Sequence, residues 1–197
     1  MKFSIEETNK LLRNRRSIYP AMYSDVPVDD AIIKEMLENA NWAPTHKLTE
    51  PWRFVVFKGE GLKKLATFQS ELYKTLSTKA GNFDASKFEK LATKPLMASH
   101  IIAIGMKRDP KALIPEIEEV SAVACAVQNM YLTATAYGVG CYWGSGGITY
   151  KEEAKSFFGL GAEDKLLGFL YVGNLKTDKW PAGKRGPIEE KVSWVES

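Results

Sequence analysis

Histidines and cysteines are residues that bind metals and act as nucleophiles, and the chain has two of each. His46 and His100 lack the H-E-x-x-H spacing, and neither Cys125 nor Cys141 has a C-x-x-C partner. Protein zinc sites draw on closely spaced ligands of these kinds, so no metal site is predicted. Two cysteines in apolar stretches are typical of thiols in a reducing compartment and not of a disulfide framework.

A glycine-rich segment from 138 to 147 could serve several kinds of chemistry. A nucleophile elbow needs a glycine where Trp143 stands, and no strand is predicted before it. A dinucleotide fingerprint would have to follow a strand, whereas Gly138 follows a predicted helix. Gly144 and Gly146 would still let the backbone approach a ligand closely, although the same glycines could simply end a helix.

Two basic clusters lie near opposite ends of the chain. Arg15-Arg16-Ser17 places two guanidinium groups and a hydroxyl after a predicted helix, and Lys184-Arg185 places two more cations in the tail. Such groups bind phosphates and carbonyl oxygens through charge-assisted hydrogen bonds. Each cluster could equally be a solvated charge pair on the surface, so neither alone identifies a ligand.

The turn before the first predicted strand carries three further polar groups. Thr45, His46 and Glu50 supply a hydroxyl, an imidazole and a carboxylate between Pro44 and Pro51. An ordinary surface turn would have a similar composition.

Hydrophobic periodicity predicts the elements that position these groups. Apolar residues at helical spacing predict helices over 5–12, 28–40 and 62–76 and a long uncharged helix over 120–137. Apolar residues of the first helix are expected to form a buried stripe, and a capping box at Thr149 and Glu152 predicts a short helix to Phe158. Runs of β-branched and aromatic residues predict strands over 53–57, 99–106 and 165–172. No element is predicted over 82–95, expected to be a mobile surface segment, or over 138–147.

The order of these elements favours an α+β fold. Helices outnumber strands and do not alternate with them regularly, unlike the pattern of a doubly wound parallel sheet. With 197 residues, 45% of them hydrophobic, the chain is expected to form a single domain over 1–197. Its net charge of +3, with bases scattered among acids, argues against nucleic-acid binding. Polar residues and glycines interrupt the uncharged stretch, and no signal segment precedes it, so we expect no membrane span and a cytoplasmic protein.

Taken together, the motifs resemble those of the nitroreductase family of FMN-dependent oxidoreductases, in its small single-domain subgroup. The matching pieces follow the family's order over nearly the whole chain: 15–17, 43–54, the long buried helix, 138–147, 168–173 and 184–190. Each piece is weak, whereas the ordered set is specific. The resemblance implies a mainly antiparallel central sheet flanked by helices, and an obligate homodimer with exchanged C-terminal tails and FMN at the interface.

The resemblance also assigns cofactor-binding residues. Arg15, Arg16 and Ser17 match the motif for the ribityl phosphate and the flavin edge, and Arg185, with Lys184, matches the basic tail at the phosphate. Trp143, Gly144 and Ser145 match the loop on the other side of the flavin. Thr45, His46 and Glu50 match positions that the partner subunit contributes.

Two residues depart from the family pattern. Many members have an amide where this chain has Leu48, and an amide where it has Glu50. An ionised Glu50 beside the reduced flavin would oppose reduction. It could instead accept a hydrogen bond from the flavin N3–H or pair with an arginine such as Arg53.

The resemblance implies that NADH or NADPH passes hydride to flavin N5, and that a nitroaromatic, a quinone or a similar small acceptor then takes it. No side chain is needed as an obligatory acid or base, so no catalytic residue is predicted. A flavin-binding or sequestering protein with little turnover would share every cofactor residue and stays an alternative. The sequence sets neither the physiological acceptor nor the choice between NADH and NADPH.

Overall fold

A four-stranded antiparallel sheet forms the centre of the protein. The computed structural model describes residues 2–196, and the strands lie in the order β1-β2-β4-β3. Their bounds are β1 Trp52–Lys58, β2 His100–Met106, β3 Gly140–Gly144 and β4 Lys165–Gly173. Every neighbouring pair is antiparallel. The α+β fold with a mainly antiparallel sheet is therefore confirmed.

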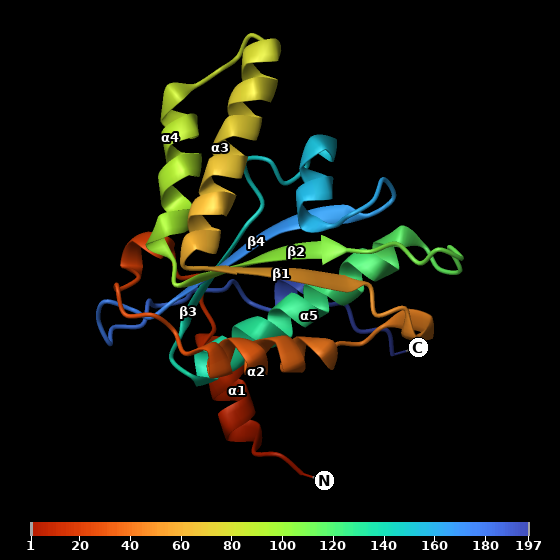
Figure 1. Cartoon of the computed structure of the whole chain (residues 1–197). Helices are drawn as coiled ribbons and strands as arrows, with labels where there is room; N and C mark the ends of the chain where they lie inside the picture. The colour runs from red at the N-terminus through yellow and green to blue at the C-terminus, as the bar shows by residue number, and fades with distance from the viewer. Residues whose placement is uncertain (1, 197) are drawn as a thin grey trace.

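Helices cover both faces of this sheet (Figure 1). One face carries α2 and α5, and the other carries α3, α4 and the short 3₁₀ helix η4. The helix α1 lies beside the end of α5. The helices run as follows: α1 Ile5–Asn14, α2 Asp30–Asn41, α3 Glu60–Lys79, α4 Ala85–Thr93, α5 Glu116–Ala136 and η4 Glu152–Phe158.

Alternation along the two central strands creates two cores. Ile102 and Ile104 of β2 pack with α2 and α5, whereas Ile101 and Ala103 face α3 and η4. Successive strand residues point to opposite faces, so a strand covered on both sides becomes apolar throughout. All seven residues of β2 are buried, which is why its position was predictable.

One α-helix and one strand lie in segments where no element was predicted. The helix α4 occupies the lysine-rich segment expected to be a mobile surface excursion, with Asp84 as its N-cap. The strand β3 occupies the glycine-rich segment expected to be a loop, and its partner β4 supplies the hydrogen bonds. A strand therefore does lead into the Trp143–Gly147 stretch, although Trp143 still stands where a nucleophile elbow needs glycine.

Two smaller expectations are also wrong. No residue of α1 is buried within the chain, so its apolar side is not a core stripe. The short helix begins after Lys151 without a side-chain cap, because Thr149 donates its hydroxyl to the carbonyl oxygen of Gly146 instead. Of the two cysteines, Cys125 is exposed on α5 and Cys141 is buried in β3.

Candidate functional site

A basic hollow forms where the end of α1 meets the C-terminal tail. Four of its lining residues are the predicted cations Arg15, Arg16, Lys184 and Arg185, and its volume is about 350 Å³. The helix ends at Asn14 and the chain turns extended at Arg15, which directs it toward β3, where Ile18 N donates to Cys141 O at 2.7 Å. The fold thus unites two clusters that lie about 170 residues apart.

The two arginines of the first cluster have different surroundings. Arg16 Nε donates to Pro181 O at 3.1 Å, and its Nη1 donates to the carbonyl oxygens of Arg13 and Arg15. Arg16 therefore ties the tail to the end of α1. The Arg15 guanidinium instead lies 5.1 Å from the centre of the Tyr131 ring.

A second hollow, of about 440 Å³, adjoins the first and shares Arg15 with it. Its walls include the predicted residues Ser17, Trp143 and Ser145. Trp143 N donates to the Tyr131 hydroxyl at 2.6 Å, and Trp143 Nε1 donates to Leu167 O at 3.0 Å. Of the eleven predicted residues, the structure thus gathers Arg15, Arg16, Ser17, Trp143, Ser145, Lys184 and Arg185 around these two hollows.

Gly168 permits this arrangement of Trp143 and Gly144. Its φ of +127° is one that side-chain-bearing residues rarely adopt. A Cβ atom at this position would lie 2.5 Å from Gly144 O and 2.7 Å from Trp143 Nε1. The absence of a side chain here lets β4 hold the end of β3 closely.

Two residues at this site were missed from the sequence. Burial raises the pKa of the Tyr131 hydroxyl, which therefore stays neutral while it positions Trp143. Lys94 follows α4, and its amine lies 4.4 Å from the centre of the Tyr142 ring in a pocket that also contains Gly144. Burial lowers the pKa of Lys94. Lys94 forms no ion pair among residues 2–196. The sequence indicates these two roles only weakly. Tyr131 is one polar ring in an apolar helix, and Lys94 is a lysine before a buried strand, where such residues are usually exposed.

Of the four remaining predicted residues, Gly144 lines a neighbouring pocket, whereas Thr45, His46 and Glu50 lie elsewhere. His46 Nδ1 is 2.5 Å from Glu118 Oε2 near the start of α5, whereas Tyr131 is near its end. A helix rises 1.5 Å per residue, so roughly 20 Å of α5 separates the two places. One chain alone does not bring this turn to the two hollows.

The turn itself is held in an uncommon conformation. Lys47, Leu48 and Glu50 have positive φ values of 51°, 54° and 41°. Glu50 N donates to the Thr45 hydroxyl at 3.1 Å, so Thr45 stabilises the turn. Arg53 donates to the backbone carbonyl of Glu50, and no ion pair of the Glu50 carboxylate occurs in the described part of the chain.

Residues 2–196 contain neither a candidate metal site nor a candidate membrane span. No group of three or more His, Cys, Asp or Glu side chains could hold a metal ion. None of the helices there is long and apolar enough to cross a membrane.

Comparisons with known proteins agree on one family. The Nitroreductase family model matches residues 12–174. "Putative NAD(P)H nitroreductase YdjA" of Escherichia coli K12 is 30% identical over 164 residues, covering 83% of this chain and 86% of YdjA. A crystal structure of a nitroreductase-like family protein from Bacillus cereus is 30% identical, with a TM-score of 0.80 and full coverage of both chains. An FMN complex of a nitroreductase-like protein from Desulfovibrio desulfuricans shares the fold, with a TM-score of 0.68 at 23% identity and 95% coverage of each chain.

Proposed function

Because this chain belongs to the nitroreductase family and is therefore an oxidoreductase, we propose that it binds FMN and transfers reducing equivalents from NADH or NADPH to a small acceptor. The acceptor is a nitroaromatic compound, a quinone or a similar molecule. YdjA, which is similar over most of its length, carries NAD(P)H in its name, and the Desulfovibrio neighbour was crystallised with FMN.

The observation that carries this proposal is the pair of adjoining hollows that share Arg15. One is surrounded by cations, as a phosphate requires, and the other has aromatic and hydroxyl walls, as a planar polar ring requires. Arg15, Lys184 and Arg185 would hold the phosphate, with Arg16 keeping the tail in place. Ser17, Trp143 and Ser145 would lie along the ring, so the residues fit FMN.

When bound, the flavin supplies the hydride chemistry, and the protein supplies binding, orientation and charge. Residues beyond Gly144 lie outside the β3–β4 pairing, so the backbone N–H groups of Ser145 and Gly146 are available for a ligand. The Lys94 amine lines the pocket that also contains Gly144, on the other face of the sheet edge, and would add a positive charge near the ring site. A cation there stabilises the negative charge that reduction adds. Arg15 and Arg16, which the resemblance places at the flavin edge, are the other candidates for this role.

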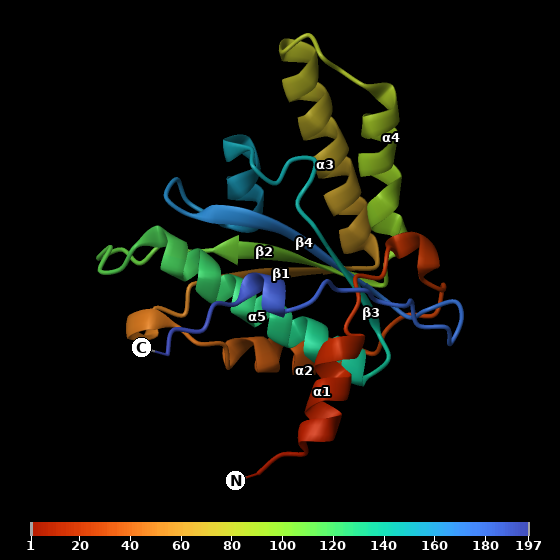
Figure 2. The same cartoon turned by 180° about the vertical axis from the view of Figure 1, so that it is seen from behind.

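We also place the complete site in a homodimer. The turn with Thr45, His46 and Glu50 lies far along α5 from Arg15, so a second copy would contribute it. From Ser121 to Gln128 the outward side of α5 carries no charge, and Figure 2 shows the tail crossing in front of this helix. Val192, Trp194 and Val195 in the tail are 44%, 85% and 91% exposed, and such apolar groups are typical of an interface.

Two measurements on the purified protein test the function. We expect flavin absorption bands, and steady consumption of NADH or NADPH when a quinone is added. Flavin bands without turnover would favour a flavin-sequestering protein, and the absence of bound or bindable FMN would contradict the proposal. Light scattering tests the dimer, because removal of the residues beyond Gly186 should expose apolar surface and weaken association. A fully dimeric truncated protein would contradict the role of the tail.

A further inference from the structure

A pocket beneath α4 lies next to the proposed flavin site, on the other face of the sheet edge. Its floor is formed by Tyr142 of β3 and by Phe169 and Tyr171 of β4, and its volume is about 220 Å³. Trp143 faces the opposite core, because neighbouring strand residues alternate between faces. The pocket reaches Gly144 and Gly146 and therefore opens beside the ring-binding loop.

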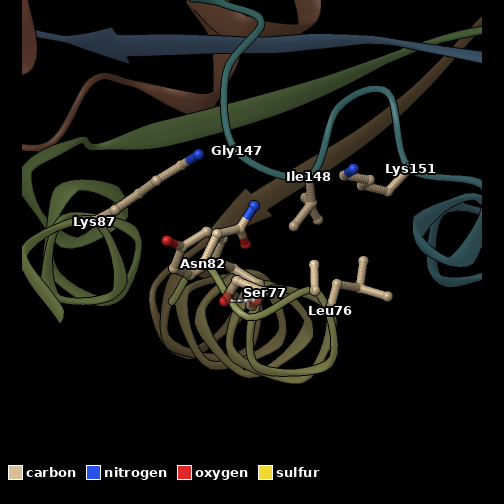
Figure 3. A pocket seen from close by; sticks show the side chains of 9 residues that line it. Leu76, Ser77, Asn82, Lys87, Gly147, Ile148 and Lys151 are labelled. Atoms are coloured by element: carbon tan, nitrogen blue, oxygen red, sulfur yellow. Dashed lines mark hydrogen bonds between the residues drawn. The ribbon is translucent and has the colours of Figure 1, made fainter. Parts of the chain in front are cut away.

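The walls of this pocket carry an excess of positive charge. Lys87 and Lys90 of α4 are spaced by one helical turn and line it together with Lys94. A smaller adjoining pocket shares Lys87 and Gly147 and adds Lys151, and Figure 3 shows Lys87 extending toward Gly147. None of these lysines forms an ion pair within residues 2–196, and no carboxylate lines either pocket.

A buried amide in the same wall also lacks a partner. Gln69 of α3 is 2% exposed and lines the pocket, yet its Nε2 has no hydrogen-bond partner among the described residues. A buried N–H group without an acceptor is costly, and native structures rarely keep one without a reason. A ligand oxygen in the pocket would provide the missing acceptor.

We propose that this pocket binds the anionic group of the electron acceptor, and that the enzyme prefers small aromatic carboxylates. The inference rests on the proposed function, because the pocket matters to catalysis only through its position beside Gly144. The aromatic floor suits a flat ring, and Lys87, Lys90 and Gln69 supply donors for a carboxylate. A small pocket next to the ring site suits an acceptor whose charge and reducible group lie on one ring. The 2′-phosphate of NADPH lies far from its nicotinamide, so a pocket beside the ring site does not suit the phosphate of the electron donor.

The kinetic test compares 4-nitrobenzoate with 4-nitrobenzamide, which has a similar shape and no charge. Reduction of either to the nitroso compound consumes one NAD(P)H and one proton and releases water. We expect a kcat/KM for the carboxylate about tenfold higher, as loss of a charge-assisted contact implies. Lys90→Gln should remove most of this preference, whereas Lys64→Gln, on an exposed part of α3, should leave it unchanged.

A binding measurement provides a readout other than activity. Calorimetric titration with benzoate, which carries no nitro group to reduce, should show binding to the FMN-loaded wild type and about tenfold weaker binding to Lys90→Gln and Gln69→Leu. Gln69→Leu should keep or raise the melting temperature, because it removes the unpaired buried amide. Benzamide should bind weakly to all of these proteins.

Equal kcat/KM values for the two acceptors, or equal binding of benzoate and benzamide, would overturn this inference and leave the proposed function intact. A Lys90→Gln variant that lowers the preference for NADPH over NADH instead would assign the lysines to the donor's phosphate and also overturn it. Failure to oxidise NAD(P)H with the nitro compounds and with a quinone would contradict the proposed function itself.

Discussion

Neighbouring residues of the same type have different roles at this site. Arg16 donates to three backbone carbonyls, on α1, on the following segment and on the tail. Arg15 lines both hollows and rests against Tyr131. Spacing in the sequence cannot separate these roles, because the tail that engages Arg16 lies about 165 residues further along the chain.

Alanine substitution of each arginine should distinguish the residue that binds FMN from the residue that holds the C-terminal tail. Arg15→Ala removes a charged donor at the proposed phosphate, which costs about 1.5–3 kcal/mol, or about 10- to 150-fold in the FMN dissociation constant. Arg16→Ala should also weaken FMN binding, but it should lower the melting temperature more, since it frees the tail. Fluorescence titration with FMN and thermal melting measure both. Unchanged affinity in both variants would place the anion site at Lys184 and Arg185 alone.

Glu50 is the residue through which the flavin potential should be tuned. In the proposed dimer its carboxylate lies near the flavin, where a negative charge opposes the uptake of electrons. We expect Glu50→Gln to raise the FMN reduction potential by on the order of 30 mV, which is about 1.4 kcal/mol for a two-electron couple. Redox titration measures the shift, with exposed Glu153→Gln as the control. A potential that stays constant or falls would mean that Glu50 is not at the flavin edge.

At the scale of elements, the site depends on the edge strand β3 and its contact with β4. Five residues of β3 pair with β4, and this pairing places Trp143 and Gly144 beside Tyr131 of α5. The glycines make β3 a poor strand by itself, because glycine loses more conformational freedom than other residues when it is fixed. The strand β3 therefore forms because it pairs with β4 and packs closely against its neighbours, and not because its own residues prefer a strand.

The elements that could be predicted are those whose own residues carry a clear apolar pattern. The three strands rich in β-branched and aromatic residues were predicted to within a residue or so. In β2 and β4, burial on both faces leaves a continuous apolar run. The strand β3 and the helix α4 were missed, since one is rich in glycine and the other has no buried residue. Tyr131 and Lys94 were missed for a related reason, because their role depends on contacts with β3 that no spacing reveals.

Gly168→Ala should disrupt the site through this strand contact. The new Cβ would press on Gly144 O and Trp143 Nε1 at a φ of +127°, and overpacking with backbone strain costs about 1–3 kcal/mol. We expect a lower melting temperature and weaker FMN binding. Gly159→Ala is the matched control, because Gly159 also has a positive φ but has no neighbouring atom within 4 Å. Gly159→Ala should lose some stability and keep its FMN affinity. Equal FMN affinity in the two variants would contradict the role of Gly168.

At the scale of the whole molecule, the family's binding residues are divided between the two ends of α5. One end carries the hollows around Arg15, and the other carries the turn with Thr45. Two copies that meet along α5 would bring the turn of each chain to the hollows of the other. We therefore propose that each FMN site is shared between two chains.

The FMN content of a mixed dimer shows whether the FMN site is shared between the chains. One chain carries Arg15→Ala with Arg185→Ala, the other carries Thr45→Trp, and separate affinity tags allow the mixed dimer to be purified. Each variant alone should form folded dimers with little FMN. In the mixed dimer one shared site has every defect and the other has none, so the account predicts one FMN per dimer by flavin absorbance. Almost no FMN in the mixed dimer would mean that each site lies within one chain, and would contradict the account.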